Sequence, residues 1–228
     1  MLEKYKRKVM RKPEKLVIEG EAGAGKTTFA CSSHTKKEPS FVINADDGGE
    51  NVFHKTGIDL IHDCIPTGDV KENAEKWDAM MATLRELAGE KSGIKRIIVD
   101  SVDKVEILAQ AKTCSLHKLS HIEDMGYGKG FSYSRGEMAK LLSGLNYLRD
   151  TQEIQPILVC HTQVRTINKP TMEPYDSFVL KLHRSLCGDI MEWADVILFV
   201  AFETIVKKID SGFNRKDSRA MQSGKRFL

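Results

Sequence analysis

The residues with the clearest chemistry lie near the start of the chain, in a glycine-rich segment that ends in Lys26-Thr27. Residues 20–27 match the pattern G-x-x-x-x-G-K-[ST], in which backbone N–H groups converge on a phosphate. The apolar run 15–19 before it predicts a buried strand, and residues 27–31 predict a helix whose amino-terminal dipole favours an anion. The alternative is a glycine-rich turn with an unrelated lysine, but strand, loop and helix follow in the required order. The segment therefore predicts nucleoside triphosphate binding.

Each polar residue of this segment has an expected task. Lys26 is expected to reach the β- and γ-phosphates, and Thr27 is expected to ligate Mg²⁺. The glycines allow the backbone to approach the phosphates closely. The predicted nucleotide-binding residues are Gly20, Glu21, Ala22, Gly23, Ala24, Gly25, Lys26, Thr27 and Thr28.

Acidic residues follow two further apolar runs. Residues 41–44 lead into Asp46-Asp47 and a Gly-Gly turn, and the β-branched run 96–99 ends at Asp100. Ligands bind where parallel strands end, so these carboxylates are expected beside the glycine-rich loop. Asp100 is the predicted second holder of Mg²⁺. For Asp46 and Asp47, an ordinary Asp-Gly turn is the alternative.

A fourth apolar strand, residues 157–160, leads into His161-Thr162-Gln163. His161 or Gln163 is the candidate for contact with the γ-phosphate. A histidine after a strand often has only a structural role, but this one follows two other phosphate-site elements in the appropriate order.

The remaining periodicity indicates a single α/β domain. Apolar residues recur at helical spacing over 71–88, which predicts a helix packed on the core. Residues 194–202 predict a buried strand, with 205–209 pairing to it as a terminal hairpin. Further helices are expected over 102–119, 137–150 and 180–193. The expected division is a basic extension at 1–14, the domain at 15–210, and a basic tail at 211–228 that is either truncated or flexible.

Composition sets the protein class. The chain has 228 residues, 41% hydrophobic and 29% charged, with a net charge of +3; such a chain can bury one ample core. No apolar run reaches the roughly 20 residues of a membrane span, so we expect a cytoplasmic protein. Five cysteines without a C-x-x-C pair fit a reducing compartment.

Two segments lack a clear period, residues 121–136 and 164–180. The first interleaves glycines with aromatic and basic residues, the combination with which single-strand binders stack bases and neutralise phosphates. Long irregular connections are usually functional or disordered, and a mobile loop that packs its aromatics on its own domain is the equal alternative. The candidate DNA contacts are Tyr127, Lys129, Phe131, Tyr133, Arg135, Arg165 and Lys169.

One metal-like spacing also occurs. Cys114, His117 and His121 would share one face of a helix, as three zinc ligands could. No fourth ligand is evident nearby, so a partly exposed helix end is the favoured interpretation.

The order of the phosphate-site residues resembles the RecA-type ATPase core. Further segments are similar to phage-encoded RecA-like nucleotide-binding proteins, a group that includes Sak-type single-strand annealing proteins. The resemblance covers roughly residues 15–210. The segments that carry it are Asp46-Asp47-Gly48-Gly49, Asp100-Ser101, Tyr127-Gly128-Lys129-Gly130, the His161 strand, Tyr175-Asp176, Leu180-Lys181-Leu182-His183 and Glu192-Trp193-Ala194-Asp195.

The resemblance implies a RecA-like α/β fold with a mainly parallel sheet flanked by helices and a C-terminal β-hairpin. It implies ATP with Mg²⁺, ATP hydrolysis, and single-stranded DNA held by two loops during phage recombination or annealing. Other implied partners are further copies of the chain, in a ring or filament, and a single-strand binding protein. Asp46, with Asp47 close behind, best matches the carboxylate that orients the attacking water; it is shorter than the usual Glu, so we expect slow hydrolysis.

Cations acting across a subunit interface are implied at Lys181, Arg184 or Lys207. Two other functions share the glycine-rich loop. One is a nucleotide-dependent protein-interaction module, a loader or regulator without DNA binding. The other is a small-molecule kinase, for which the sequence offers no arginine-rich lid.

Overall fold

A computed structural model describes residues 11–89, 91–210 and 216–227, with side chains described as far as residue 203 and again at 223–227. It has the predicted α/β fold, with a mainly parallel sheet flanked by helices and a C-terminal antiparallel hairpin. None of the helices in these ranges is long and apolar enough to cross a membrane. The strands are β1 (Leu16–Gly20), β2 (Ser40–Asn44), β3 (Ile61–Asp63), β4 (Arg96–Asp100), β5 (Gln155–Lys169), β6 (Met172–Leu180), β7 (Val196–Asp210) and β8 (Lys216–Phe227).

The strand order is β3-β2-β4-β5-β1-β7-β8, and β6 pairs only with β5. β5 therefore stands between β1, which leads into the glycine-rich loop, and β4, which ends at Asp100. All of these central pairings are parallel, and Gly20 lies opposite both His161 and Val200. Asn44 lies opposite Asp100. The register thus brings the ends of β1, β2 and β4 to one edge of the sheet, where β5 and β7 pass beside them at His161 and Val200.

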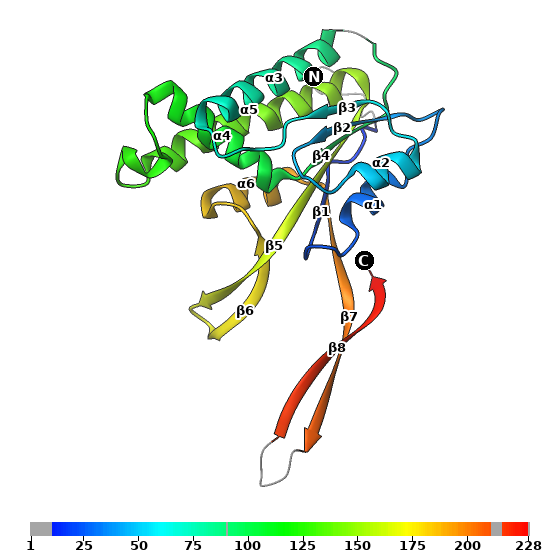
Figure 1. The fold of residues 1–228 in the computed structure, drawn as a ribbon, viewed down its shortest axis with the longest axis vertical. Helices are drawn as coiled ribbons and strands as arrows, with labels where there is room; N and C mark the ends of the chain where they lie inside the picture. The colour runs from blue at the N-terminus through cyan, green and yellow to red at the C-terminus, as the bar shows by residue number, and fades with distance from the viewer. Residues whose placement is uncertain (1–10, 90, 211–215, 228) are drawn as a thin grey trace, which may run out of the picture.

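The helices form a layer on each face of this sheet (Figure 1). One buried cluster lies under α3, α4, α5 and α6, and a smaller one lies under α1 and α2. Strands buried on both faces need continuous apolar runs, as in β1 and β4. The helices are α1 (Lys26–Cys31), α2 (Glu50–Thr56), α3 (Val70–Gly89), α4 (Val102–His117), the short 3₁₀ helix η2 (Ile122–Met125), α5 (Lys129–Gln152) and α6 (Arg184–Trp193).

The predicted helix at 71–88 is confirmed as α3. Its stripe includes Trp77, Met80 and Leu84, which are 1%, 0% and 3% exposed. Because α3 packs against α4 and α5, this stripe is core and carries no chemistry.

The prediction of an irregular loop over 121–136 is wrong for its second half. α5 begins at Lys129, after Gly128 in a left-handed conformation with φ of 69°. Gly130 lies within this helix, and a Cβ there would come within 2.1 Å of the Ile122 carbonyl oxygen. These glycines therefore serve a sharp turn and a close approach of η2 to α5, rather than a flexible loop.

The prediction of an irregular connection over 164–180 is also wrong. β5 continues to Lys169 and turns back as β6, with Val164 opposite Phe178 and Ile167 opposite Tyr175. Beyond the helices both faces of this hairpin are largely exposed, so burial imposes no apolar–polar alternation on it. We call the part formed by residues 162–180 the first arm.

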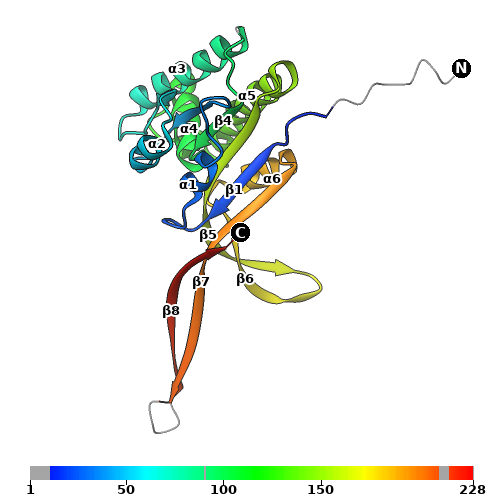
Figure 2. The same ribbon diagram turned by 90° about the vertical axis from the view of Figure 1, so that its right-hand side faces the viewer.

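The terminal hairpin exists, but with different strands. Residues 205–209 were expected to pair with 194–202; they instead continue the same strand, β7, which pairs with β8. Most of the predicted basic tail is therefore a strand. We call residues 201–210 with 216–227 the second arm. Figures 1 and 2 show both arms projecting from the same end of the sheet, away from α3 and α5.

Candidate nucleotide site and the adjoining surfaces

The glycine-rich loop joins β1 to α1 at the edge where the parallel strands end. A Cβ on Gly20 would lie 2.2 Å from the Val200 carbonyl oxygen, so the loop can start beside β7 only at a glycine. Gly25 caps α1 with φ of 101°, in the left-handed region that favours glycine. Two of the three motif glycines are thus required for different structural reasons, Gly20 by a close backbone approach and Gly25 by a left-handed conformation.

Lys26 is the buried cation of this loop. Its side chain is 4% exposed, and its Nζ donates to the Glu21 carbonyl oxygen at 2.8 Å. Burial lowers the pKa of Lys26, and the negative charge of Asp100 opposes that shift. The ammonium is therefore held inside the loop beside an acidic residue, as a phosphate ligand requires.

Asp100 lies at the tip of β4 and is 3% exposed. Burial raises the pKa of this carboxyl, while a hydrogen bond with Thr27 opposes the rise. Carboxylate and hydroxyl oxygens side by side are the ligands that Mg²⁺ prefers. The donor set of Thr27 and Asp100 therefore fits a magnesium ion bound with a nucleotide.

Asp46 is positioned by the end of β4. The backbone N–H groups of Ala45 and Asp46 both donate to the Asp100 carbonyl oxygen, at 2.6 and 3.2 Å. The Asp46 carboxylate lines the same cleft as Lys26, whereas Asp47 is exposed and does not line it. Of the two predicted carboxylates, the structure brings only Asp46 to the cleft.

His161 reaches the cleft from β5 and is oriented by Asp103, a residue that sequence reasoning missed. His161 Nδ1 lies 3.1 Å from Asp103 Oδ1, and its backbone N–H also donates to that carboxylate at 3.2 Å. Its Nε2 faces Asp46 Oδ2 at 3.7 Å. Burial raises the pKa of Asp103, but hydrogen bonding and charge from His161 outweigh it and leave this pKa below its usual value.

Gln163 does not lie in the cleft. Its side chain contacts the Leu180 carbonyl oxygen and, in the orientation that satisfies its amide, accepts from the Arg165 guanidinium at 2.7 Å. Of the two candidates on this strand, only His161 therefore faces the predicted γ-phosphate position.

A second missed residue is Arg226, at the end of β8. In the sequence it reads as one more cation of a basic tail, and only the pairing of β8 with β7 carries it back to the cleft. The cleft has a volume of about 340 Å³. It is lined by Gly23, Gly25, Lys26, Thr27, Thr28, Asp46, Gly48, Gly49, Val52, Asp100, His161 and Arg226.

The remaining loop residues lie around this cleft. Ala24 is buried beneath the loop in the smaller core cluster. Glu21 and Ala22 have exposed side chains, and Glu21 contributes its carbonyl oxygen to Lys26. The loop, two cations and two carboxylates together can hold a polyphosphate and its metal ion.

A family model described as an AAA domain matches residues 12–227. The chain belongs to this family. A search among curated proteins finds no match. The AAA domain makes the chain a P-loop NTPase, a class that typically binds ATP with Mg²⁺. The match also spans β8 and Arg226, beyond the core expected to end at residue 210.

The first group of DNA candidates lies on the turn after η2 and on the first two turns of α5. Tyr127 is fully exposed, and Lys129 is exposed beside it. Phe131 instead stacks on His183, with ring centroids 4.3 Å apart. Tyr133 contacts His117 at 4.7 Å between centroids, and Arg135 forms a bidentate pair with Asp189, one bond being 2.6 Å. Phe131 and Arg135 therefore have structural contacts already.

The second group lies on the first arm. Arg165, Ile167 and Tyr175 share one face of it, because Ile167 lies opposite Tyr175 and side chains alternate along a strand. The register shifts after Ile167, and Lys169 lies opposite Met172. Lys169 Nζ lies 5.7 Å from the centre of the Tyr175 ring. Arg165 donates to the Leu182 carbonyl oxygen at 2.9 Å, at the base of the arm.

Of the cations predicted to act across a subunit interface, Lys181 and Arg184 do not line the cleft. Both have exposed side chains, Lys181 between β6 and α6 and Arg184 at the first residue of α6. The side chain of Lys207 lies outside the described residues. Their role in a neighbouring subunit stays a prediction.

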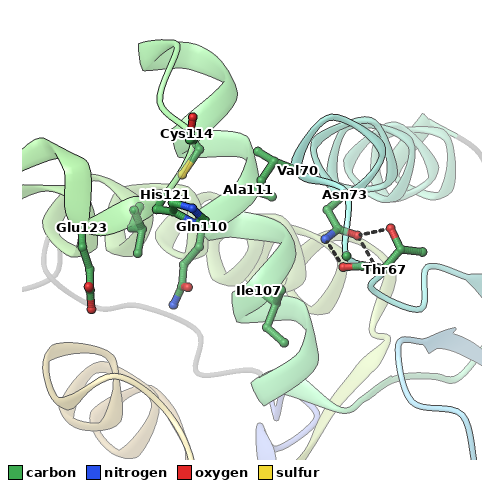
Figure 3. Close-up of a pocket in the computed structure, with 12 residues that line it drawn as sticks. Thr67, Val70, Asn73, Ile107, Gln110, Ala111, Cys114, His121 and Glu123 are labelled. Atoms are coloured by element: carbon green, nitrogen blue, oxygen red, sulfur yellow. Dashed lines mark hydrogen bonds between the residues drawn. The ribbon is translucent and has the colours of Figure 1, made fainter.

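A separate pocket of about 360 Å³ lies between α4 and the segments before α3 and α5 (Figure 3). Cys114 and His121 both line it, but His117 does not. Within the described ranges no group of three or more His, Cys, Asp or Glu side chains is placed to hold a metal ion. The structure therefore favours the helix-end interpretation of the C-x-x-H-x-x-x-H spacing.

Proposed function

We propose that this protein is a magnesium-dependent ATPase that binds single-stranded DNA, in recombination or strand annealing of the phage type. One observation carries the proposal: β5 contributes His161 to the nucleotide cleft and then continues directly as the first arm, which bears Arg165, Lys169 and Tyr175. A strand is stiff over this length. A change at its cleft end can therefore alter the placement of the arm.

In the proposed reaction the chain's own residues orient the attacking water and neutralise the charge of the phosphates. Lys26 neutralises the phosphates, and Thr27 with Asp100 would hold Mg²⁺, which would supply charge stabilisation to the transferring phosphoryl group. Asp46 orients the attacking water. His161, held by Asp103, donates a hydrogen bond to the γ-phosphate. Because His161 belongs to β5, this bond makes the position of β5 depend on whether the γ-phosphate is present.

A second connection between the nucleotide cleft and the proposed DNA-binding segments runs along α4. Asp103 and Glu106 lie one helical turn apart, and both carboxylate oxygens of Glu106 accept from the His183 backbone N–H at 3.1 Å. His183 stacks on Phe131 and shares a pocket of about 520 Å³ with Arg165, Arg184 and Ser185. The two segments proposed to bind DNA thus adjoin at His183.

The electrostatics of this junction favour a polyanion. Burial lowers the pKa of His183, and the positive charges of Arg165 and Arg184 lower it further. The acidic Asp176 lies on the other face of the arm, where it accepts from Thr166 at 2.7 Å. Cations beside exposed aromatic faces bind single strands through phosphates and stacked bases, with little sequence preference.

The test is the rate of ATP hydrolysis with and without an oligonucleotide such as dT30. The proposal predicts a slow basal rate that single-stranded DNA stimulates, while an equal length of duplex stimulates less. If single-stranded DNA leaves the hydrolysis rate unchanged and does not bind in the presence of ATP, the proposed DNA binding is wrong. The proposed ATPase activity would not be affected by that result.

One observation favours a second candidate function, the nucleotide-dependent protein-interaction module. Val164, Met172 and Phe178 on the first arm are 59%, 52% and 46% exposed, and grouped exposed apolar residues are typical of protein interfaces. This candidate predicts that ATP changes the mass of the protein or of a complex while DNA changes nothing.

A further inference from the structure

A second, mostly apolar pocket of about 340 Å³ adjoins the phosphate cleft. The two share Gly25, Thr28 and Arg226 among their lining residues. They therefore adjoin, as one polar compartment and one mostly apolar compartment. The apolar pocket is lined by Ala24, Gly25, Thr28, Phe29, Ser32, Val200, Arg226 and Phe227.

Arg226 lies at the junction of the two compartments. Its guanidinium carbon is 5.4 Å from the centre of the Phe202 ring, on the paired strand β7. Its Cδ is 3.6 Å from the point where a Cβ on Gly25 would stand. The side chain is thus held between β7 and the phosphate-binding loop.

We propose that β8 completes the nucleotide site. Arg226 binds the phosphates from the side opposite the strand ends, and the apolar pocket between Phe29, Val200 and Phe227 takes the nucleobase. This inference rests on the nucleotide-binding part of the proposed function and on no part of its DNA binding. A nucleotide has one flat, weakly polar end and one anionic end, and the adjoining compartments match both.

The lining also sets the base specificity. Among the described residues of the apolar pocket the hydroxyls are those of Thr28 and Ser32, and Ser32 Oγ already donates to the Phe29 carbonyl oxygen at 2.7 Å. None of the described residues that line it has an amide or carboxylate side chain. Adenine and guanine differ in their edge hydrogen bonds, so a pocket that stacks the base without reading its edge discriminates weakly.

The proposal gives the second arm a role. β8 pairs with β7 along the arm, so a nucleotide that holds Arg226 also fixes the inner end of β8. Nucleotide exchange is then linked to the placement of the second arm, as it is to the first arm through His161.

The test is binding of fluorescent ATP, GTP and AMP analogues without DNA. Arg226→Gln is expected to weaken ATP about tenfold, as loss of an exposed charge-assisted contact does, and to weaken AMP much less. Phe227→Ala is expected to weaken all three alike. Wild-type affinities for ATP and GTP are expected within about tenfold of each other. Lys225→Gln is the matched control, because Lys225 is exposed and lines neither compartment.

Arg226→Lys separates charge from folding, since it keeps the cation and should recover most of the ATP affinity. Equal ATP binding by Arg226→Gln and wild type would overturn the inference, as would an Arg226→Lys variant as weak as Arg226→Gln. Strong preference for one purine would overturn the base pocket. Failure of the nucleotide site itself would appear differently, as normal ATP binding by Lys26→Ala.

Discussion

The nucleotide cleft and the two arms are built from the same strands by opposite rules. In the cleft, Lys26 and Asp100 are 4% and 3% exposed, and each has a position fixed by the parallel register of β1, β4 and β5. On the first arm, Met172 and Tyr175 are 52% and 39% exposed, and the two strands contact mainly each other. Chemistry that needs exact geometry lies where packing fixes it, and the proposed recognition of a long, variable ligand is assigned to exposed side chains.

The largest expected effect is in the cleft. Lys26→Ala removes a buried cation from the phosphate position, and we expect ATP affinity to fall by about 100-fold or more, given the strength of charge-assisted hydrogen bonds. Nucleotide-independent DNA binding should remain, because the arms keep their charges. Titration with a fluorescent ATP analogue measures the first effect and oligonucleotide anisotropy the second. Lys36→Ala, at an exposed loop, is the control. Equal losses of ATP binding and DNA binding in Lys26→Ala would contradict the separation of the cleft from the arms.

The next effect concerns the orientation of His161. Asp103→Asn should lower the rate constant for hydrolysis by about 10- to 100-fold, since Asp103 fixes the ring that faces the phosphate. ATP affinity should change little, because Asp103 does not line the cleft. Single-turnover hydrolysis with a parallel binding titration separates the two quantities. A parallel fall in affinity would assign Asp103 to folding instead of positioning, and Asp103→Glu should recover part of the rate.

On the first arm, the double variant Arg165→Gln with Lys169→Gln should weaken binding of single-stranded DNA by about tenfold at moderate salt. The slope of log affinity against log salt should fall by about 1.4, the value for two phosphate contacts on a single strand. ATP affinity should be unchanged. Anisotropy over a salt series measures both. Lys36→Gln with Lys37→Gln removes two exposed charges elsewhere. An equal change in that control would show that the arm contributes only its net charge and is not a DNA-binding site.

The smallest effect is a pH dependence of the cleft. Burial raises the pKa of Asp100, so its carboxyl becomes protonated at a higher pH than an ordinary aspartate. A protonated carboxyl is a poor Mg²⁺ ligand, so magnesium-dependent ATP affinity should begin to fall at a higher pH than it would with an ordinary aspartate at this position. Magnesium-independent binding should fall less. An Asp100→Asn variant that keeps the wild-type pH profile would exclude this residue as the titrating group.

The same contrast explains what the sequence could predict. Buried strands and one-sided helices impose apolar patterns, so β1, β4, α3 and the residues at the strand tips were predicted from those patterns and their order. Both faces of the first arm are largely exposed, so the sequence around Val164 and Phe178 carries no alternation, and this hairpin was missed. The terminal hairpin was predicted, but with the wrong residues in its second strand. Asp103 resembles an ordinary acidic residue in a helical first turn, and Arg226 resembles a tail cation; only the register of β5 with β4 and of β8 with β7 shows their positions.

The central claim is that the nucleotide held in the cleft controls the arms through β5. The most direct measurement is the affinity for fluorescent dT30 with Mg²⁺ and a slowly hydrolysed ATP analogue, and again without nucleotide, for wild type and for His161→Ala. The account predicts clearly tighter DNA binding with nucleotide in wild type, and a much smaller difference in His161→Ala although that variant still binds ATP. Equal DNA affinity in both states of the wild type would contradict it.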